Sequence, residues 1–80
     1  MKITVLFFGV AQDIAGVRQM PLELMEGATA IDLRSELANR FTGLDKGLAY
    51  ALAVNEKLCN ETHLLSDGDV AAVLPPVSGG

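Results

Sequence analysis

The first residues of the chain alternate between two sets of side chains. This period of two, rich in β-branched and aromatic residues, predicts a β-strand over residues 2–8 that Gly9 closes. Because bulky apolar groups fall on both sides, we expect a central strand with one side, that of Leu6 and Phe8, facing something other than this small domain's own core. One side consists of Ile3, Val5 and Phe7, and the other consists of Thr4, Leu6 and Phe8.

A second period-two pattern covers residues 20–25, in which Met20, Leu22 and Leu24 share one side. Pro21 lies within this run and has no backbone N–H to donate to a neighbouring strand. We therefore expect this strand at an edge of the sheet.

Residues 29–42 have the three- and four-residue spacing of a helix. Thr29 and Asp32 form a capping box, in which the hydroxyl and the carboxylate can satisfy the first free amides of the helix. Gly43 supplies a C-terminal stop, so the helix should end at about Thr42. The apolar stripe expected to pack on one face of the sheet consists of Ala30, Leu33, Leu37, Phe41 and Leu44.

The second half of the chain contains short strands separated by turns. A third strand is predicted over Tyr50–Val54, and the polar residues 55–57 turn the chain into a short segment, Leu58-Cys59. The Asp-Gly step within residues 65–69 is typical of a turn before the last strand, Val70–Leu74.

This order of elements predicts an α+β domain, with one main helix packed on one face of a mixed sheet. The first and last strands should lie side by side in the middle. The opposite face would be left open, and its apolar residues become candidates for a docking surface: Leu6, Phe8, Leu58 and Leu74. The alternative is that these four residues simply close the core.

Composition narrows the functional classes. Eighty residues make one domain, too small for a sizeable catalytic pocket. The net charge of −4 leaves no cluster of Lys or Arg that could neutralise several phosphates, so we expect no nucleic-acid ligand. The single cysteine fits a reducing compartment, and no apolar stretch is long enough for a membrane span or a signal peptide. We therefore expect a cytoplasmic protein without a membrane partner.

The last six residues are the most informative stretch. Pro75 and Pro76 cannot continue a helix or a central strand, and they favour an extended segment. Gly79 and Gly80 have no side chains, so the final backbone can enter a narrow channel and present its carboxylate to a partner's site. We expect residues 1–74 to form the folded domain and residues 75–80 to form an extended C-terminal tail. A Gly-Gly end without any role is the alternative.

With these residues in view, the whole chain resembles the small, sulfur-carrying subunit of molybdopterin synthase, a ubiquitin-like β-grasp family. The resemblance rests on the order of strands and helix, on the turn Leu65-Ser66-Asp67-Gly68-Asp69, and above all on the ending Leu74-Pro75-Pro76-Val77-Ser78-Gly79-Gly80. The Gly-Gly end is shared with ubiquitin and with the sulfur carrier of thiamine synthesis. The preceding Pro-Pro-Val-Ser is much more specific.

The resemblance implies a reaction at the C-terminus. An ATP-dependent enzyme, which brings its own zinc, adenylates the Gly80 carboxylate; a sulfur donor protein then supplies the sulfur of a thiocarboxylate. The tail, with Pro75, Pro76, Val77, Ser78 and Gly79, enters the large synthase subunit in a two-plus-two complex. There Gly80 gives sulfur to cyclic pyranopterin monophosphate, building the dithiolene of the molybdenum cofactor.

The resemblance places the active site on the large subunit, so this chain should not be catalytic alone, and it should bind no metal or cofactor itself. Three alternatives remain open: a carrier for thiamine or another pathway, a ubiquitin-like modifier, and a plain interaction domain with an idle tail. Within the chain, we interpret Cys59 as structural instead of a persulfide carrier. His63 is interpreted as a solvated loop residue, and Asp67 and Asp69 as turn residues.

Overall fold

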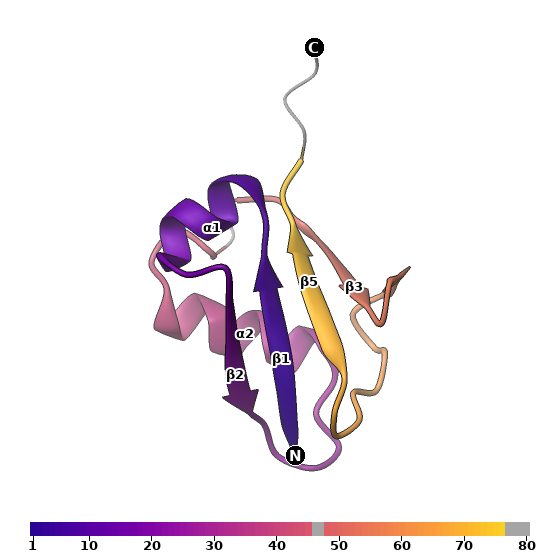
Figure 1. Ribbon diagram of the computed structural model, residues 1–80. Coiled ribbons are helices and arrows are strands. Elements are labelled where there is room, and N and C mark those ends of the chain that lie inside the picture. Colours follow the sequence, from indigo (N-terminus) through magenta and orange to yellow (C-terminus); the bar gives the residue numbers. More distant parts are fainter. Residues whose placement is uncertain (46–47, 77–80) are drawn as a thin grey trace.

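The computed structural model describes residues 1–45 and 48–76. Its single sheet has the order β2-β1-β5-β3-β4, so the first and last strands are paired in parallel near its centre (Figure 1). The other pairs are antiparallel. The elements are β1 (Lys2–Phe7), α1 (Gly9–Ala15), β2 (Gln19–Glu23), α2 (Ala30–Arg40), β3 (Ala51–Val54), β4 (Lys57–Leu58) and β5 (Val70–Leu74).

The predicted strand and helix positions are confirmed, with shifted ends. The first strand stops at Phe7 instead of Phe8, and α2 ends at Arg40 instead of Thr42. The second and third strands are Gln19–Glu23 and Ala51–Val54, and the short strand is Lys57–Leu58 because Lys57 already pairs with Val54. In the predicted capping box, Asp32 Oδ2 accepts hydrogen bonds from the Thr29 backbone N–H at 2.8 Å and from its hydroxyl at 3.1 Å.

The prediction of one helix before β3 was incomplete, because α1 follows β1 directly. Gly9 starts this two-turn helix with φ +52°, and Gly16 ends it in the left-handed conformation with φ +77°. Its buried residue, Ala11, belongs to the core. The spacing of Val10-Ala11 and Ile14-Ala15, followed by Gly16, is a helical signal that could have revealed it.

The core lies between the sheet and α2, which crosses one sheet face (Figure 1). Alternate residues of β1, β3 and β5 point into it, and Leu33 and Leu37 of α2 are fully buried against them. Phe7 and Phe41 meet edge to face, with ring centroids 5.6 Å apart. The predicted stripe of α2 is therefore the core side of the helix.

The prediction of an edge position for β2 is confirmed, and backbone pairing explains how Pro21 fits there. Phe7 N–H bonds to the Arg18 carbonyl, and Met1 and Leu24 bond to each other. In an antiparallel pair such bonded positions alternate with unbonded ones, so the backbone of Pro21, opposite Thr4, faces away from β1. Pro21 thus costs no ladder bond and removes one donor from the exposed edge.

The turn between β3 and β4 is formed by two residues with positive φ, Asn55 at +51° and Glu56 at +71°. This is the pattern of a type I′ hairpin turn, which favours Asn followed by Gly. At Glu56 the Cβ atom adds a steric cost of about 1–2 kcal/mol in the left-handed conformation.

We expect Glu56→Gly to raise the free energy of unfolding by about 0.5–1 kcal/mol, since the greater freedom of glycine in the unfolded chain offsets part of the relief. Urea denaturation measures this change. Glu56→Ala keeps the Cβ atom and is the matched control. A gain of the same size in both variants would contradict the steric explanation.

Candidate functional site

The sheet face away from α2 bears a row of apolar residues across four strands. Register places Leu6 of β1 beside Ala72 of β5, Ala72 beside Ala53 of β3, and Ala53 beside Leu58 of β4. In the part of the chain that the structure describes, neither helix lies over this face (Figure 1). We call it the open face. Small alanines in the middle make the row shallow, with leucines at either side.

The four predicted docking residues lie on or beside this face. Leu6 and Leu74 are half-buried, whereas Leu58 is 74% exposed. The prediction that Phe8 belongs to the first strand is wrong, because Phe8 occupies the N-cap position of α1 with an extended backbone. Its side chain is 47% exposed. Phe8 and Leu58 are therefore not among the buried core residues, and their role in docking stays a prediction.

The central strand β5 ends at Leu74 and leads into Pro75 and Pro76, the first two residues of the predicted tail. Pro75 is half-buried and lies close to Gly9. A Cβ atom placed on Gly9 would be 3.9 Å from Pro75 Cγ, an ordinary van der Waals contact. Pro76 is exposed. The predicted tail residues Val77, Ser78, Gly79 and Gly80 lie outside the described residues.

The first residue of α1, Gly9, therefore lies beside Pro75. Val10, in the first turn of this helix, is 45% exposed and is an additional apolar residue at this end of the sheet. Sequence reasoning missed it because the helix itself was missed. Phe8 and Val10 flank Gly9 in the sequence and Leu74 precedes Pro75, so three apolar residues adjoin the place where Gly9 and Pro75 approach each other.

The turn before β5 holds its two aspartates in structural roles. Asp67 Oδ1 accepts the Lys2 backbone N–H at 2.7 Å, and Asp69 Oδ2 accepts that of Ser66 at 2.8 Å. Asn55 donates to the other oxygen of Asp69 at 2.9 Å. The interpretation of Asp67 and Asp69 as turn residues is thus confirmed. Among residues 1–45 and 48–76, no three His, Cys, Asp or Glu side chains are grouped to hold a metal ion.

Arg34 of α2 secures the segment that leads into β3. Its guanidinium lies 4.5 Å from the centroid of the Tyr50 ring and donates from Nη2 to the Tyr50 carbonyl at 3.0 Å. Burial raises the pKa of the Tyr50 hydroxyl, although the charge and hydrogen bond of Arg34 act in the opposite direction. The contact therefore anchors β3 to α2.

Cys59 lies directly after β4 and is partly exposed, with its thiol 3.7 Å from the Leu52 carbonyl. Burial raises the pKa of this thiol, and the charge of Arg34 offsets the effect only in part. A thiol that serves as a nucleophile needs the opposite shift, because the thiolate is the reactive form. The environment of Cys59 thus favours a structural role.

We expect Cys59 to be alkylated by iodoacetamide more slowly at pH 8 than a cysteine in an unstructured peptide. Because its pKa is raised, less thiolate is present at this pH, and the rate should continue to rise at pH values where the peptide thiol has levelled off. The pH dependence of the alkylation rate, followed by mass spectrometry, measures this. A rate curve shifted towards lower pH than that of the peptide would restore the persulfide hypothesis.

His63 is exposed, in agreement with the prediction of a solvated loop residue. Its backbone carbonyl accepts the Ala30 N–H at 2.9 Å, and the Glu61 carbonyl accepts that of Ile31 at 3.0 Å. These carbonyls satisfy first-turn amides of α2. The loop that contains His63 is thereby fixed against the helix.

The chain is similar in sequence to a known protein family and to sulfur carrier subunits from other organisms. The model of the ThiS family matches residues 5–80. Along its full length the chain is 35% identical to the molybdopterin synthase sulfur carrier subunit of Chlamydomonas reinhardtii, all of which is covered.

Solved structures agree with this. Subunit 1 of the molybdopterin converting factor from Pyrococcus furiosus is 32% identical, with a TM-score of 0.87 over 96% of this chain and 99% of that one. In a complex of subunits 1 and 2 of the molybdopterin-converting factor from Helicobacter pylori, a fully covered chain is 32% identical with a TM-score of 0.71. SAMP1 from Haloferax volcanii, 21% identical and covered completely, has a TM-score of 0.89 and supports the fold. The predicted β-grasp fold is confirmed.

Proposed function

This chain belongs to the ThiS family, and we propose that it is the sulfur-carrier subunit of a molybdopterin synthase, with the Gly80 carboxylate as its working group. The observation that most supports this is the position of the tail: the central strand β5 leads directly into Pro75-Pro76 at the border of an exposed apolar face. One surface can thus dock a partner while the adjoining tail reaches into it.

The proposed reaction takes place at the last carbonyl carbon. A free carboxylate resists nucleophiles because attack would have to expel an oxide. Reaction with ATP, on an adenylating enzyme, gives an acyl-adenylate and releases pyrophosphate, and the outer sulfur of a donor-protein persulfide then displaces AMP to form an acyl disulfide. A second donor thiol attacks the inner sulfur of this acyl disulfide, which releases the Gly80 thiocarboxylate and leaves a disulfide on the donor. The thiocarboxylate sulfur then bonds to cyclic pyranopterin monophosphate, and water hydrolyses the acyl–sulfur bond, which leaves the sulfur on the substrate and restores the Gly80 carboxylate. Two such transfers supply both sulfurs of the dithiolene.

In this proposal each part of the chain has a distinct task. Residues 1–74 form the β-grasp body and residues 75–80 form the tail. Gly79 and Gly80 leave the reacting carbon unshielded, and residues 75–78 thread the tail into the large subunit. The docking surface on the body consists of Leu6, Phe8, Leu58 and Leu74, which the open face and the start of α1 present together.

The proposed partners are the large synthase subunit, in a two-plus-two complex, the ATP-dependent adenylating enzyme and the sulfur donor protein. The chain binds no cofactor, and ATP belongs to the activating enzyme. We propose a cytoplasmic setting, which the single cysteine supports. For a large-subunit partner, the support is the related Helicobacter pylori complex of two subunits. In the part of the chain that the structure describes, no helix is long and apolar enough to cross a membrane.

Intact-mass spectrometry tests the proposed chemistry. After incubation with ATP, an adenylating enzyme and a sulfur source, the chain should gain about 16 Da, the difference between oxygen and sulfur. Omitting ATP should abolish the gain. A gain of about 32 Da that fragment spectra place on Cys59, as a persulfide would give, with Gly80 unchanged, would contradict the proposal.

Co-purification separates the pathways. A carrier for molybdopterin synthesis should retain the large synthase subunit, a carrier for thiamine should retain thiazole synthase, and a modifier should appear in isopeptide-linked conjugates. We expect the first outcome, because the relatives with 30–35% identity over nearly the full chain have the molybdopterin synthase name.

A further inference from the structure

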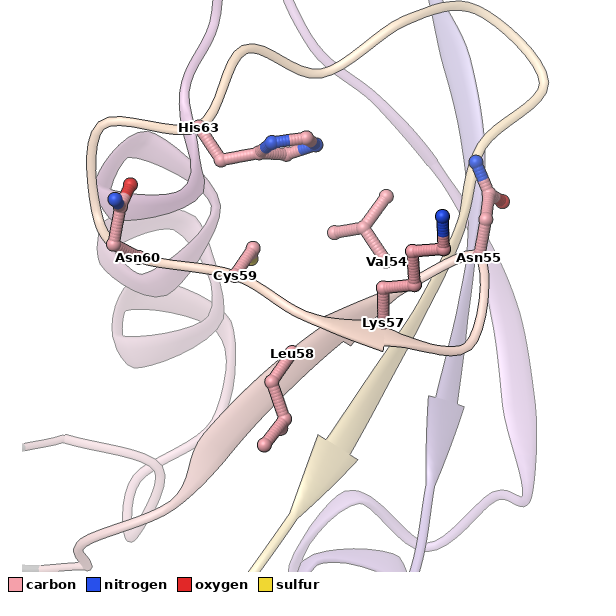
Figure 2. A pocket seen from close by; sticks show the side chains of 7 residues that line it. All are labelled: Val54, Asn55, Lys57, Leu58, Cys59, Asn60 and His63. Carbon is pink, nitrogen blue, oxygen red and sulfur yellow. The ribbon is translucent and has the colours of Figure 1, made fainter.

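A cavity of about 630 Å³ opens at the edge of the sheet, between the β3–β4 hairpin and the loop that follows β4. Figure 2 shows Lys57, Cys59 and His63 turned towards this space, with Val54 beneath them. Leu58 lies between Lys57 and Cys59 in the sequence and belongs to the lining, but its side chain is directed to the other side of β4 (Figure 2). The β4 edge therefore separates this cavity from the open face.

The wall of the cavity is held by backbone bonds. The Ala30 and Ile31 amides of α2 bind the carbonyls of His63 and Glu61, and Cys59 N–H donates to the Leu52 carbonyl at 3.1 Å. Asn60 Oδ1 accepts both the Thr62 backbone N–H and its hydroxyl. The loop thus positions His63 over the cavity through the backbone, without using the imidazole.

The Lys57 ammonium is a hydrogen-bond donor only, and the His63 imidazole offers a further N–H. None of its lining residues is acidic, although the chain as a whole has a net charge of −4. Across residues 1–45 and 48–76, neither the Lys57 ammonium nor the His63 imidazole forms an ion pair or a side-chain hydrogen bond. The Asn55 amide, in contrast, is engaged by Asp69 and Val70. The cavity therefore suits an anionic acceptor.

We propose that this cavity receives an acidic side chain of the large synthase subunit, bound by Lys57 and His63, so that the interface extends from the open face around the β4 edge. This inference rests on the function proposed above. Continuity favours it, because Leu58 of the proposed docking surface is the direct neighbour of Lys57. A single exposed cation binds a free anion weakly, whereas a carboxylate on an already docked partner is present at high effective concentration.

Lys57→Glu tests the proposal in the complete carrier–large-subunit complex. The dissociation constant should rise on the order of tenfold, through loss of the attraction and gain of a repulsion, and the dependence of affinity on salt should become flatter. Arg18→Glu is the matched control: it makes the same charge change before β2, at the opposite edge of the sheet, and should alter affinity less than twofold. If both variants weaken binding to the large subunit equally, the change in net charge alone explains the loss of affinity, and the inference is overturned.

Charge reversal on the partner provides a second test. Among single Asp→Lys and Glu→Lys variants of the large subunit, one should restore binding to Lys57→Glu beyond the product of the separate effects. If wild-type carrier binds and no variant restores it, the inference alone fails. If wild-type carrier does not bind the large subunit, the proposed function fails first. Tight binding of free inorganic phosphate, seen as shifts of the His63 resonances below about 1 mM, would contradict the weak free-anion affinity expected of one cation.

Discussion

Removal of Gly79 and Gly80 should reduce sulfur transfer to background while leaving the domain folded. The deletion removes the carbonyl carbon that the proposed reaction adenylates, and the shortened chain ends at Ser78, which has a side chain where Gly80 has none. The free energy of unfolding should stay within about 0.5 kcal/mol, because the tail follows the last strand of the sheet. Product formation by the reconstituted synthase, together with urea denaturation, measures both effects.

Gly80→Ala refines this experiment, because it keeps the chain length and the carboxylate. The added methyl group should obstruct a channel fitted to glycine and strongly reduce transfer, whereas docking of the body on the large subunit should persist. Wild-type transfer by this variant would contradict the threading argument. Loss of docking after the Gly-Gly deletion would instead mean that the tail supplies most of the affinity and the open face little.

Leu58→Asp should weaken binding to the large subunit on the order of 100-fold. The substitution removes one anchor's apolar surface and would bury an unpaired carboxylate at the interface. Because Leu58 is 74% exposed, the isolated domain should keep its stability. Isothermal titration calorimetry of the purified pair measures the change.

Met25→Asp is the matched control for this prediction. Met25 is 85% exposed and follows β2, at the edge of the sheet opposite to Leu58. Its replacement should leave the affinity nearly unchanged. If both variants weaken binding equally, general exposure of apolar side chains, and not the open face, would account for the result.

Much of the fold could be predicted because its signals are local. Three predictions each depend on a few neighbouring residues, and the structure confirms them: the alternation of the first strand, the edge position of the strand that contains Pro21, and the apolar stripe of α2. Helix α1 was missed because only two turns of weak periodicity separate two glycines. The spacing of its apolar residues is a local signal, but so short a helix is stabilised mainly by the burial of Ala11 against distant strands, which the local pattern does not show.

The site was predictable to a different degree. The open face followed from Leu6 lying on the side of β1 away from Ile3, Val5 and Phe7. The positions of Val10 and Lys57 did not follow, because they depend on where α1 begins and on the register between β3 and β4. A shift of one residue in that register would exchange Lys57 and Leu58 between the two sides of the edge.

The parallel pairing of β1 with β5 joins residues 4–7 to residues 70–73, so two segments far apart in the sequence must meet before the sheet can close. This contact cannot form on a partial chain that lacks β5, so folding has to wait until β5 has left the ribosome. A molecule broken off before β5 would lack the middle of the sheet and present no ordered docking surface. A partner that binds the folded body therefore binds only molecules that contain β5, the strand directly before Pro75, even if it makes no contact with the terminus.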